Sequence, residues 1–440
     1  MKFMRKGVAL AALLVGFATV SVFAGGQQAA GGDAKAAPAS GPVKISVWHS
    51  FVGADQRAAF MERRMAEFKA AYPDIEVDEQ KIPRDQYQTK LKTLAAAGEL
   101  PDGFLLWPNA MTKEFASAGL LADINGVLAK ETAWRDSLLP RVLEEFTVNG
   151  KTYSAGLGVS VTSIVFYNKA LFDKHGVKVP TTYDELKAAV KTFTAAGVIP
   201  IAHGNKPKWP AQSCVFSLLA NRYTGSQWLD DVLAKKGAKF TDKPFIDALA
   251  SLQELAALGA FNRDYNSVDD VQMRDYFFRG EAAMMIGGSW ILPGLISNAS
   301  ADLKANIRMT VLPSVNGGRG DQNAMSGVSS TGIVINAKAS PEKKAALEKL
   351  IVFLTNDEAQ QIYTLSNIPV SSKTMVPDPA KVDPLYTMMV DLIKAHPLVT
   401  VYDSALNSEQ TEIINNGLQG VMLGALKPAD LAAQLQAAVK

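Results

Sequence analysis

Aromatic, amide, hydroxyl and carboxylate side chains gather where predicted strands end and the next helices begin. Flat indole rings bury the apolar C–H face of a pyranose with little loss of conformational entropy, while fixed carboxylates and amides bond its hydroxyl edge. An amino acid would instead require charged groups for its ammonium and carboxylate. These residue types therefore favour a hydroxyl-rich ligand. The candidate ligand-binding residues are Trp48, His49, Ser50, Asp102, Trp107, Asn109, Asn205, Trp209, Ser289, Trp290 and Asp403.

Several of these candidates also have a structural interpretation. A tryptophan at a strand end can pack in a core or between domains as well as stack on a ligand. Asp102 follows Pro101 and can cap a turn, and His49 can be a hydrogen-bonded structural histidine. Trp134 and Trp228 fall within helical patterns, so we assign them to packing.

No catalytic or metal-binding motif accompanies the candidate residues. The sequence has no GxSxG, HExxH or Walker motif, and its four histidines, at 49, 175, 203 and 396, are scattered. The lone Cys214 lies in a predicted helix without a neighbouring histidine. We therefore expect a binding protein without cofactor or metal. A secreted carbohydrate-active hydrolase stays as an alternative, because 43 acidic residues offer many carboxylate pairs.

Alternating strand and helix patterns must position these loops. Alternation of apolar and polar residues predicts a strand at 44–48, and helical spacing follows at 57–71. The run Thr181-Thr182-Tyr183-Asp184-Glu185 predicts a helix start, because a threonine cap is followed by acidic residues in the first turn. The repeated order of strand and helix favours a mainly parallel sheet with helices on both faces. Further strands are expected at 75–82, 103–107, 162–167, 198–202, 282–286, 308–312 and 332–335, and further helices at 86–98, 214–223 and 245–258.

Length and charge narrow the class of protein. The 440 residues are enough for two lobes of ordinary domain size. With 45 basic and 43 acidic residues the chain lacks the basic surface typical of nucleic-acid binding. One cysteine excludes an internal disulfide, so stability must come from burial.

The N-terminus has the pattern of an export signal. Lys2, Arg5 and Lys6 precede an uncharged stretch at 7–24, and Val22-Phe23-Ala24 fits a cleavage site. We expect residues 1–24 to be a cleaved signal peptide, with a membrane anchor as the alternative. Because no cysteine lies near the cleavage point, we expect no lipoprotein anchor. The Gly-, Ala- and Pro-rich segment at 25–42 is predicted to be a flexible tether.

Ordered landmarks across residues 43–440 resemble family 1 of the extracellular solute-binding proteins of bacterial ABC importers, the family that contains maltose-binding protein. The most specific is IVFYNKALFDKHGVKVPTTYDELKAAVK, which is similar to the family's YNK, LF and PTT pattern. The others, in the family's order, are KISVWHSF, FKAAYPDIEV, AAAGELPDGFLLWP, FRGEAAMMIGGSW, MTVLP and GALKPADLAAQLQ.

This resemblance implies an α/β, two-lobed periplasmic-binding-protein fold of class II type, with discontinuous lobes joined by a hinge. By landmark, lobe one is residues 43–157 and 313–372, and lobe two is residues 158–312 and 373–440. The chain crossings are expected at 158–162, 312–314 and 369–373. The family's GSW position implies that Trp290 contacts ligand, and an acid near Asp102 often does so too.

The resemblance also implies a function. The expected protein is a periplasmic or other extracytoplasmic monomer that captures a mono- to oligosaccharide by lobe closure and delivers it to the permease of an ABC transporter. A receptor for a non-sugar solute such as a glycerol phosphate is the alternative, with Lys206, Arg222 or Arg319 as anion partners. The identity of the solute is not predicted.

Overall fold

The computed structural model describes residues 41–53 and 56–439. The predicted signal peptide lies outside the described residues, as does the predicted tether apart from residues 41 and 42. From Pro42 onward the chain forms one compact unit.

One five-stranded sheet organises the N-terminal lobe, lobe one. Its order is β2 (Ile75–Lys81), β1 (Val43–His49), β3 (Gly103–Leu106), β13 (Gly332–Asn336) and β4 (Leu121–Ala122). Its buried side chains form a single apolar cluster that also includes side chains of the principal helices. The helices of this lobe are α1 (Gln56–Ala71), α2 (Arg84–Ala97), α3 (Ala110–Ser117), α4 (Asn125–Lys130), α5 (Thr132–Ser137), α6 (Arg141–Glu144), α15 (Pro341–Thr355) and α16 (Asp357–Leu365), and β5 (Thr147–Val148) pairs with β6 (Lys151–Thr152).

A four-stranded sheet organises lobe two. Its order is β11 (Ile307–Thr310), β8 (Ile164–Asn168), β10 (Ala282–Gly287) and β9 (Ile199–Ala202). Two apolar clusters include side chains of this sheet. The surrounding helices are α7 (Lys169–Lys174), α8 (Tyr183–Ala195), α9 (Ser217–Thr224), α10 (Ser226–Leu233), α11 (Lys243–Ala257), α12 (Met273–Phe278), α13 (Leu292–Asn298), α14 (Ala301–Asn306), α17 (Pro384–Ala395), α18 (Tyr402–Ala405), α19 (Ser408–Met422) and α20 (Pro428–Ala437).

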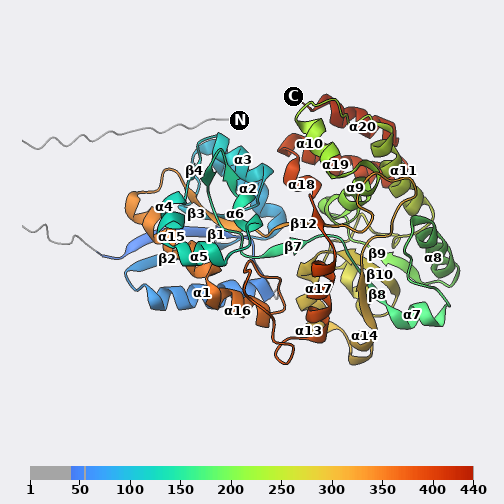
Figure 1. The fold of residues 1–440 in the computed structure, drawn as a ribbon, viewed down its shortest axis with the longest axis horizontal. Coiled ribbons are helices and arrows are strands. Elements are labelled where there is room, and N and C mark those ends of the chain that lie inside the picture. Colours follow the sequence, from blue (N-terminus) through green and yellow to red (C-terminus); the bar gives the residue numbers. More distant parts are fainter. Residues whose placement is uncertain (1–40, 54–55, 440) are drawn as a thin grey trace, which may run out of the picture. The chain divides into compact units, whose positions relative to one another are not determined.

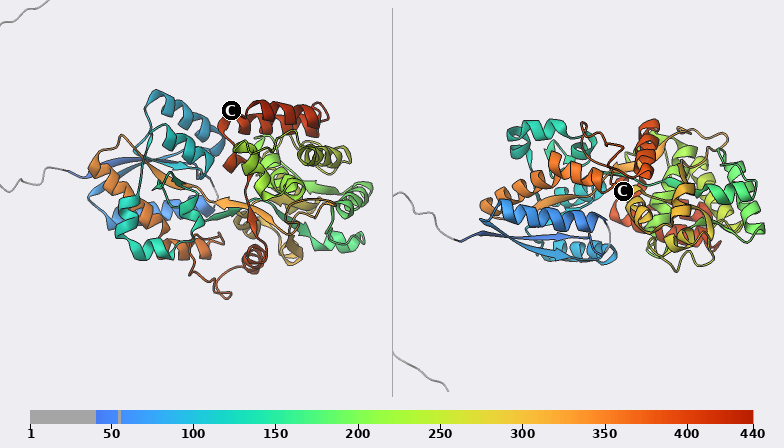
Figure 2. Two further views of the ribbon diagram at one scale, coloured as in Figure 1. Left: turned by 45° about the horizontal axis from the view of Figure 1, so that its top comes forward. Right: turned by 90° about the horizontal axis from the view of Figure 1, so that it is seen from below.

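Both lobes are discontinuous in sequence. In Figures 1 and 2 the blue and teal N-terminal segments share lobe one with the orange segment of α15 and α16, while the green, yellow and red segments form lobe two. Each lobe therefore receives the chain again after it has passed through the other.

The expectation of mainly parallel sheets is wrong. In lobe one β1 pairs in parallel with β2 and β3, but β13 runs antiparallel to both β3 and β4. In lobe two β8 runs antiparallel to β10 and β11, and only β9 and β10 are parallel. A parallel pair requires a crossover within one lobe, whereas β8 and β13 enter from the other lobe and run in the opposite direction.

A three-stranded sheet lies where the chain passes between the lobes. It consists of β14 (Leu398–Val399), β12 (Met325–Ser329) and β7 (Val159–Val161), with β7 and β12 antiparallel. Neither β12 nor β14 was expected from the sequence.

The position of the second chain crossing differs from the expectation of 312–314. Val315 and Ala324 are buried in a lobe-two cluster, and Met325 is buried in the other, so the chain returns to lobe one only between Met325 and Ile333. The crossing lies beyond the Leu312-Pro313 landmark because the residues that follow it are still buried in the apolar clusters of lobe two. We propose that the other two crossings lie between Val159 and Val161 and between Ile368 and Val382.

Local chemistry explains the backbone at two element boundaries of lobe two. The predicted start of α8 is confirmed: the Thr182 hydroxyl accepts from the Glu185 amide, and the Glu185 carboxylate accepts from the Thr182 amide, both at 3.2 Å. After β10, a Cβ atom on Gly288 would lie 2.0 Å from the Trp290 ring. Glycine at this position therefore lets that ring lie against the backbone.

No helix among the described residues combines the length and apolar character that a membrane crossing requires.

Candidate functional site

Two cavities lie between the lobes. The first has a volume of about 820 Å³ and the second about 480 Å³. They share five lining residues: Arg84 and Trp107 from lobe one, Val328 from β12, and Trp209 and Asp403 from lobe two. These shared residues make the two cavities parts of one cleft with walls from both lobes.

The cleft lies at the carboxyl ends of strands, where open α/β sheets bind ligands. Trp107 directly follows β3, and Trp209 lies in the loop after β9. Trp290 belongs to a short 3₁₀ turn, Ser289–Ile291, that follows β10. Asp403 lies in α18, just after β14. Residues separated by almost 300 positions therefore meet because their strands end at the same place.

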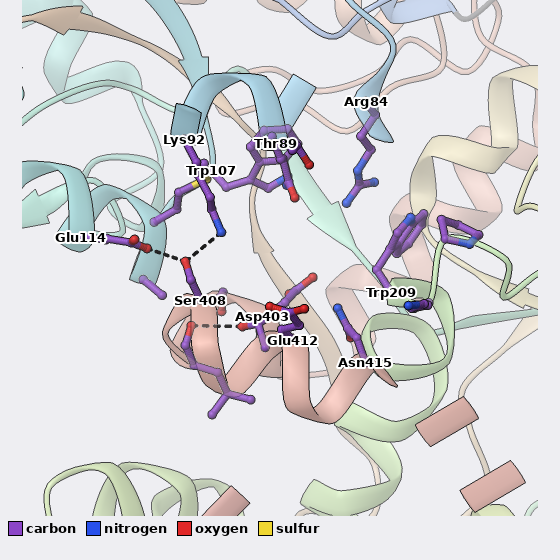
Figure 3. A pocket seen from close by; sticks show the side chains of 18 of the residues that line it. Arg84, Thr89, Lys92, Trp107, Glu114, Trp209, Asp403, Ser408, Glu412 and Asn415 are labelled. Carbon is purple, nitrogen blue, oxygen red and sulfur yellow. Dashed lines mark hydrogen bonds between the residues drawn. The ribbon is translucent and has the colours of Figure 1, made fainter. Parts of the chain in front are cut away.

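Three tryptophans and one arginine supply flat surfaces to the cleft. The rings of Trp209 and Trp290 lie 5.8 Å apart between centroids and are tilted by 60°. The guanidinium carbon of Arg84 lies 4.1 Å from the ring centroid of Trp209 and 5.6 Å from that of Trp107. In Figure 3 Arg84 points from the start of α2 toward Trp209. Trp107, Arg84 and Trp209 thus form an aromatic and cationic bridge across the cleft.

Asp403 brings a carboxylate into both cavities. Burial raises its pKa, while a hydrogen bond from the Ser213 hydroxyl and the positive charge of Arg84 act in the opposite direction. The Ser213 bond is 2.7 Å long. Ser213 belongs to a π-helical segment, Ala211–Phe216, that precedes α9. Such segments often occur at functional sites, and this one places Ser213 beside Asp403.

Hydrogen bonds connect the lobes at the edge of the first cavity. Lys92 Nζ of α2 donates to Ser408 Oγ at 2.9 Å, and Ser408 Oγ donates to Glu114 Oε2 of α3 at 2.6 Å. Figure 3 shows both side chains of lobe one directed at Ser408, which begins α19 of lobe two. All three residues line the first cavity.

Polar groups complete the two walls. The second cavity is rich in hydroxyl groups, and the first has amides and carboxylates. The hydroxyl-bearing residues of the second cavity are Ser50, Ser160, Thr162, Ser213, Ser329, Ser330 and Thr331. The amides and carboxylates of the first are Gln88, Glu114, Asp269, Asp403, Glu412, Asn415 and Asn416.

Five of the eleven candidate residues from the sequence line these cavities: Ser50, Trp107, Trp209, Trp290 and Asp403. The structure therefore brings together candidates that follow five different strands, β1, β3, β9, β10 and β14.

Two lobe-one candidates at the end of β1 lie outside the two cavities. Half-buried Trp48 receives the ammonium of Lys90 over its ring at 4.7 Å. His49 is fully buried, with Nε2 2.8 Å from Glu79 Oε1 and Nδ1 accepting from the Phe51 amide. Its ring is therefore fully engaged in the protein.

Asp102 is also placed away from the cleft. It precedes β3, so it lies at the amino edge of the sheet, whereas Trp107 lies at the carboxyl edge. Its carboxylate accepts from the Ser46 amide at 2.9 Å and pairs with Lys343 Nζ at 2.9 Å. The acid joins β1, β3 and α15 and has a structural role there.

Asn109, Asn205 and Ser289 also lie outside the two cavities and hold backbone near them. Asn109 has a positive φ of 57° and bonds the Glu145 carbonyl through its amide at 2.6 Å. Asn205 is buried and accepts from the Ala211 amide at 3.0 Å. Ser289 accepts from the Val161 amide at 3.3 Å. Each of these side chains or amides orients a loop that carries a neighbouring cavity residue.

Sequence reasoning missed the cationic lining of the cleft. Arg84 and Lys92 are on α2, Arg57 is on α1 and Arg274 is on α12. The rule that found Trp107 also applies to Arg84, because Arg84 begins α2 just after β2 ends at Lys81. Nothing in the local pattern distinguishes Arg57 or Arg274 from solvent-exposed helical arginines.

The family follows from residues 53–361, which match the model of the bacterial extracellular solute-binding proteins. This segment is more than half of the chain. The chain belongs to this family. The family resemblance read from the sequence is confirmed, and the cleft between the lobes is the candidate solute site of this solute-binding protein.

Individual relatives agree with the family. Over 321 residues the solute-binding protein is 26% identical to the multiple sugar-binding protein of Streptococcus mutans serotype c, with 72% of each chain covered. A structure described for xylan utilization by the thermophilic bacterium Caldanaerobius polysaccharolyticus superposes with a TM-score of 0.82 and 27% identity, covering 90% of this chain and all of that one.

The fold itself has further support from a chitin oligosaccharide binding protein. Its TM-score is 0.82 at 24% identity, with 90% of this chain and 98% of that chain covered. The expected two-lobed α/β fold is confirmed.

Proposed function

We propose that the protein is an extracytoplasmic receptor that captures a neutral sugar, from a mono- to an oligosaccharide, and delivers it to the permease of an ABC transporter. One observation carries the choice of sugar: Trp107, Trp209 and Trp290 line a hydroxyl-rich cleft with walls from both lobes. Indole rings cover pyranose faces, and the surrounding hydroxyls, amides and charged groups suit the ring hydroxyls. The names of the relatives, a multiple sugar-binding protein among them, support the same class of solute.

The charges of the lining favour a neutral solute over a phosphate. Among the described lining residues of the two cavities, cations and carboxylates nearly balance. The cations are Arg57, Arg84, Lys92, Lys206, Lys208 and Arg274, and the acids are Glu114, Asp269, Asp270, Asp403 and Glu412.

The expected anion partners are largely elsewhere. Buried Arg222 donates to the carbonyl oxygens of Asp321 and Leu312, and Arg319 is exposed and lines neither cavity. Of the three basic residues expected to pair with a glycerol phosphate, Lys206 alone lines a cavity.

Closure of the lobes is the proposed mechanism of capture. A sugar that contacts Trp107 on one lobe and Trp209 or Trp290 on the other makes all its contacts only when the lobes approach. Its binding therefore shifts the population toward the closed state by its difference in affinity for the two states. In this proposal the solute is released unchanged, without a catalytic step or a cofactor. The receptor is exported by a cleaved signal peptide, carries no lipid anchor and acts as a monomer.

A thermal-shift screen tests this function. The mature chain is heated with mono-, di- and oligosaccharides of the xylo, chito and malto series and with glycerol phosphate. A true ligand raises the melting temperature, because it stabilises the folded state by RT ln(1 + [L]/Kd). Chromatography of the recovered sugar then tests for turnover. Stabilisation by glycerol phosphate alone, or cleavage of the sugar, would refute the proposal.

A further inference from the structure

One face of the Trp209 ring is covered by another side chain. Its guanidinium neighbour, Arg84, lies 4.1 Å from the ring centroid, which is the distance of direct stacking. Elsewhere the Trp209 ring packs against Trp290 and the apolar cluster of lobe two. A guanidinium over an indole face is held by the ring quadrupole and by dispersion.

A sugar and a guanidinium cannot occupy the same ring face. Stacking of a pyranose also requires van der Waals distance from the indole, so both groups need the space that Arg84 occupies. Arg84 belongs to α2 of lobe one, whereas Trp209 belongs to lobe two. The contact therefore also joins the lobes.

We propose that Arg84 is an internal competitor for the sugar-stacking face of Trp209, so that a sugar binds there only after displacing the guanidinium. This inference rests on the proposed function and deepens it, because it makes Arg84 a determinant of which sugars bind. The competition lowers the affinity for sugars that stack on Trp209. It leaves unchanged the affinity for sugars that occupy one cavity without reaching Trp209.

The position of Arg84 between the two cavities supports this role. It lines both of them, together with Trp107, Val328, Trp209 and Asp403. A chain of sugar units long enough to pass from one cavity to the other must cross this bridge. Asp403 also lines both cavities, and its carboxyl group interacts electrostatically with the positive charge of Arg84.

The competing interpretation predicts the opposite sign. If Arg84 instead donates hydrogen bonds to the bound sugar, its removal leaves sugar hydroxyls unpaired and weakens binding. If Arg84 competes with the sugar, its removal strengthens binding. The two roles are therefore separated by the direction of the change in Kd.

A double-mutant cycle with the sugars that stabilise the wild-type protein tests the proposal. Arg84→Ala, Trp209→Ala and the double variant are titrated calorimetrically with the longest and shortest of those sugars. We expect Arg84→Ala to tighten binding of the longest sugar roughly two- to thirty-fold, the range of a cation–π contact. In the Trp209→Ala background the same substitution should leave Kd unchanged, because the ring for which Arg84 and the sugar compete is absent.

Lys90→Ala is the matched control. Lys90 is also on α2 and also lies over an indole, that of Trp48, but Trp48 lines neither of the two cavities. We expect this variant to bind sugar with unchanged Kd. Weaker binding by Arg84→Ala, or equal tightening in the Trp209→Ala background, would overturn the proposal. Thermal unfolding confirms that each variant is folded.

A ligand-free measurement separates this inference from the proposed function. Acrylamide quenching of tryptophan fluorescence should increase in Arg84→Ala, and the increase should disappear when Trp209 is replaced by Phe. If no sugar binds the wild-type protein, the proposed function fails, and quenching still decides whether Arg84 covers the ring. Unchanged quenching in Arg84→Ala would refute the covering contact itself.

Discussion

The role of a cleft residue depends on which end of its strand it occupies. Trp107 and Asp102 flank the same short strand, β3. Trp107 follows the strand and lines both cavities, whereas Asp102 precedes it and pairs with Lys343. Residue type alone assigns a ligand-binding role to both residues. The direction of the strand distinguishes their roles, because it places them at opposite edges of the sheet.

Trp290 is the first test at the residue scale. Trp290→Ala removes a ring that lines the second cavity and packs against Trp209. We expect sugar binding to weaken by about 1–3 kcal/mol through lost stacking and apolar contact, measured by calorimetry. Trp48→Ala, which removes an indole outside the two cavities, is the control and should retain the wild-type Kd. Equal affinity of the Trp290 variant and the wild-type protein would exclude Trp290 from the site.

Asp403 gives a pH-dependent prediction. Burial raises its pKa in the folded state, so the unfolded chain ionises more readily and the carboxylate opposes folding at neutral pH. We expect Asp403→Asn to raise the free energy of unfolding at neutral pH. The gain should shrink as the pH falls through the raised native pKa toward the ordinary value of 3.8.

Urea unfolding across this pH range measures the effect of Asp403→Asn. Asp378→Asn, at an exposed position paired with Lys381, is the control and should change stability by less than about 0.5 kcal/mol. A destabilised Asp403→Asn at neutral pH would mean that the Ser213 bond and the charge of Arg84 outweigh burial.

At the scale of elements, α6 and the residue after it hold the strand β12 that passes between the lobes. Arg141 Nη1 donates to the Gly327 carbonyl at 3.1 Å, and Glu145 Oε2 accepts from the Ser329 amide at 2.5 Å. Arg141 and Glu145 also pair with each other at 3.2 Å. One ion pair of lobe one therefore fixes two backbone groups of β12 on either side of Val328, which lines both cavities.

Substitution of Glu145 tests this arrangement. Glu145→Ala leaves the Ser329 amide without its acceptor, and we expect a loss of about 1–3 kcal/mol in the free energy of unfolding. Glu145→Gln keeps a carbonyl acceptor in place. Because burial already raises the pKa of Glu145, the neutral side chain should be tolerated better than alanine. Urea unfolding compares the two variants. An equal loss of unfolding free energy in both would show that the ion pair with Arg141, rather than the acceptor for the Ser329 amide, provides the stabilisation.

At the scale of the whole molecule, side chains of both lobes meet at the edge of the first cavity. Ser408 accepts from Lys92 and donates to Glu114, so one hydroxyl links α19 to both α2 and α3. These two hydrogen bonds favour the approach of the lobes. In the proposed closure mechanism, loss of these contacts should shift the equilibrium between open and closed forms.

Ser408→Ala should shift that equilibrium toward open forms. We expect a larger radius of gyration than in the wild-type protein without ligand, and the same radius with saturating sugar, both measured by small-angle X-ray scattering. Ser297→Ala is the control, because the Ser297 hydroxyl donates to the Pro293 carbonyl of its own helix in lobe two. An unchanged ligand-free radius in Ser408→Ala would show that these two hydrogen bonds do not hold the lobes together.

Strand and helix positions were largely predictable, because they depend on local periodicity and capping. The threonine and acidic residues that include Thr182 and Glu185 indicate the start of α8. Most predicted strands lie within a few residues of the observed strands. Short β12 and β14 were missed, since their pairing with β7 and with each other comes from segments far apart in the chain. The second chain crossing was misplaced for the same reason: burial of Val315 and Ala324 is a tertiary property.

The sequence by itself determined the family, the alternation of strands and helices, and the aromatic residues at strand ends, because each is written in residue order and short-range spacing. Tertiary structure alone decided strand direction, the partners of His49 and Asp102, and the meeting of Arg84 with Trp209 across the lobes. The physical reason is that these contacts join residues from different parts of the chain. Their distances depend on how two separately packed cores approach each other, and no local pattern encodes that.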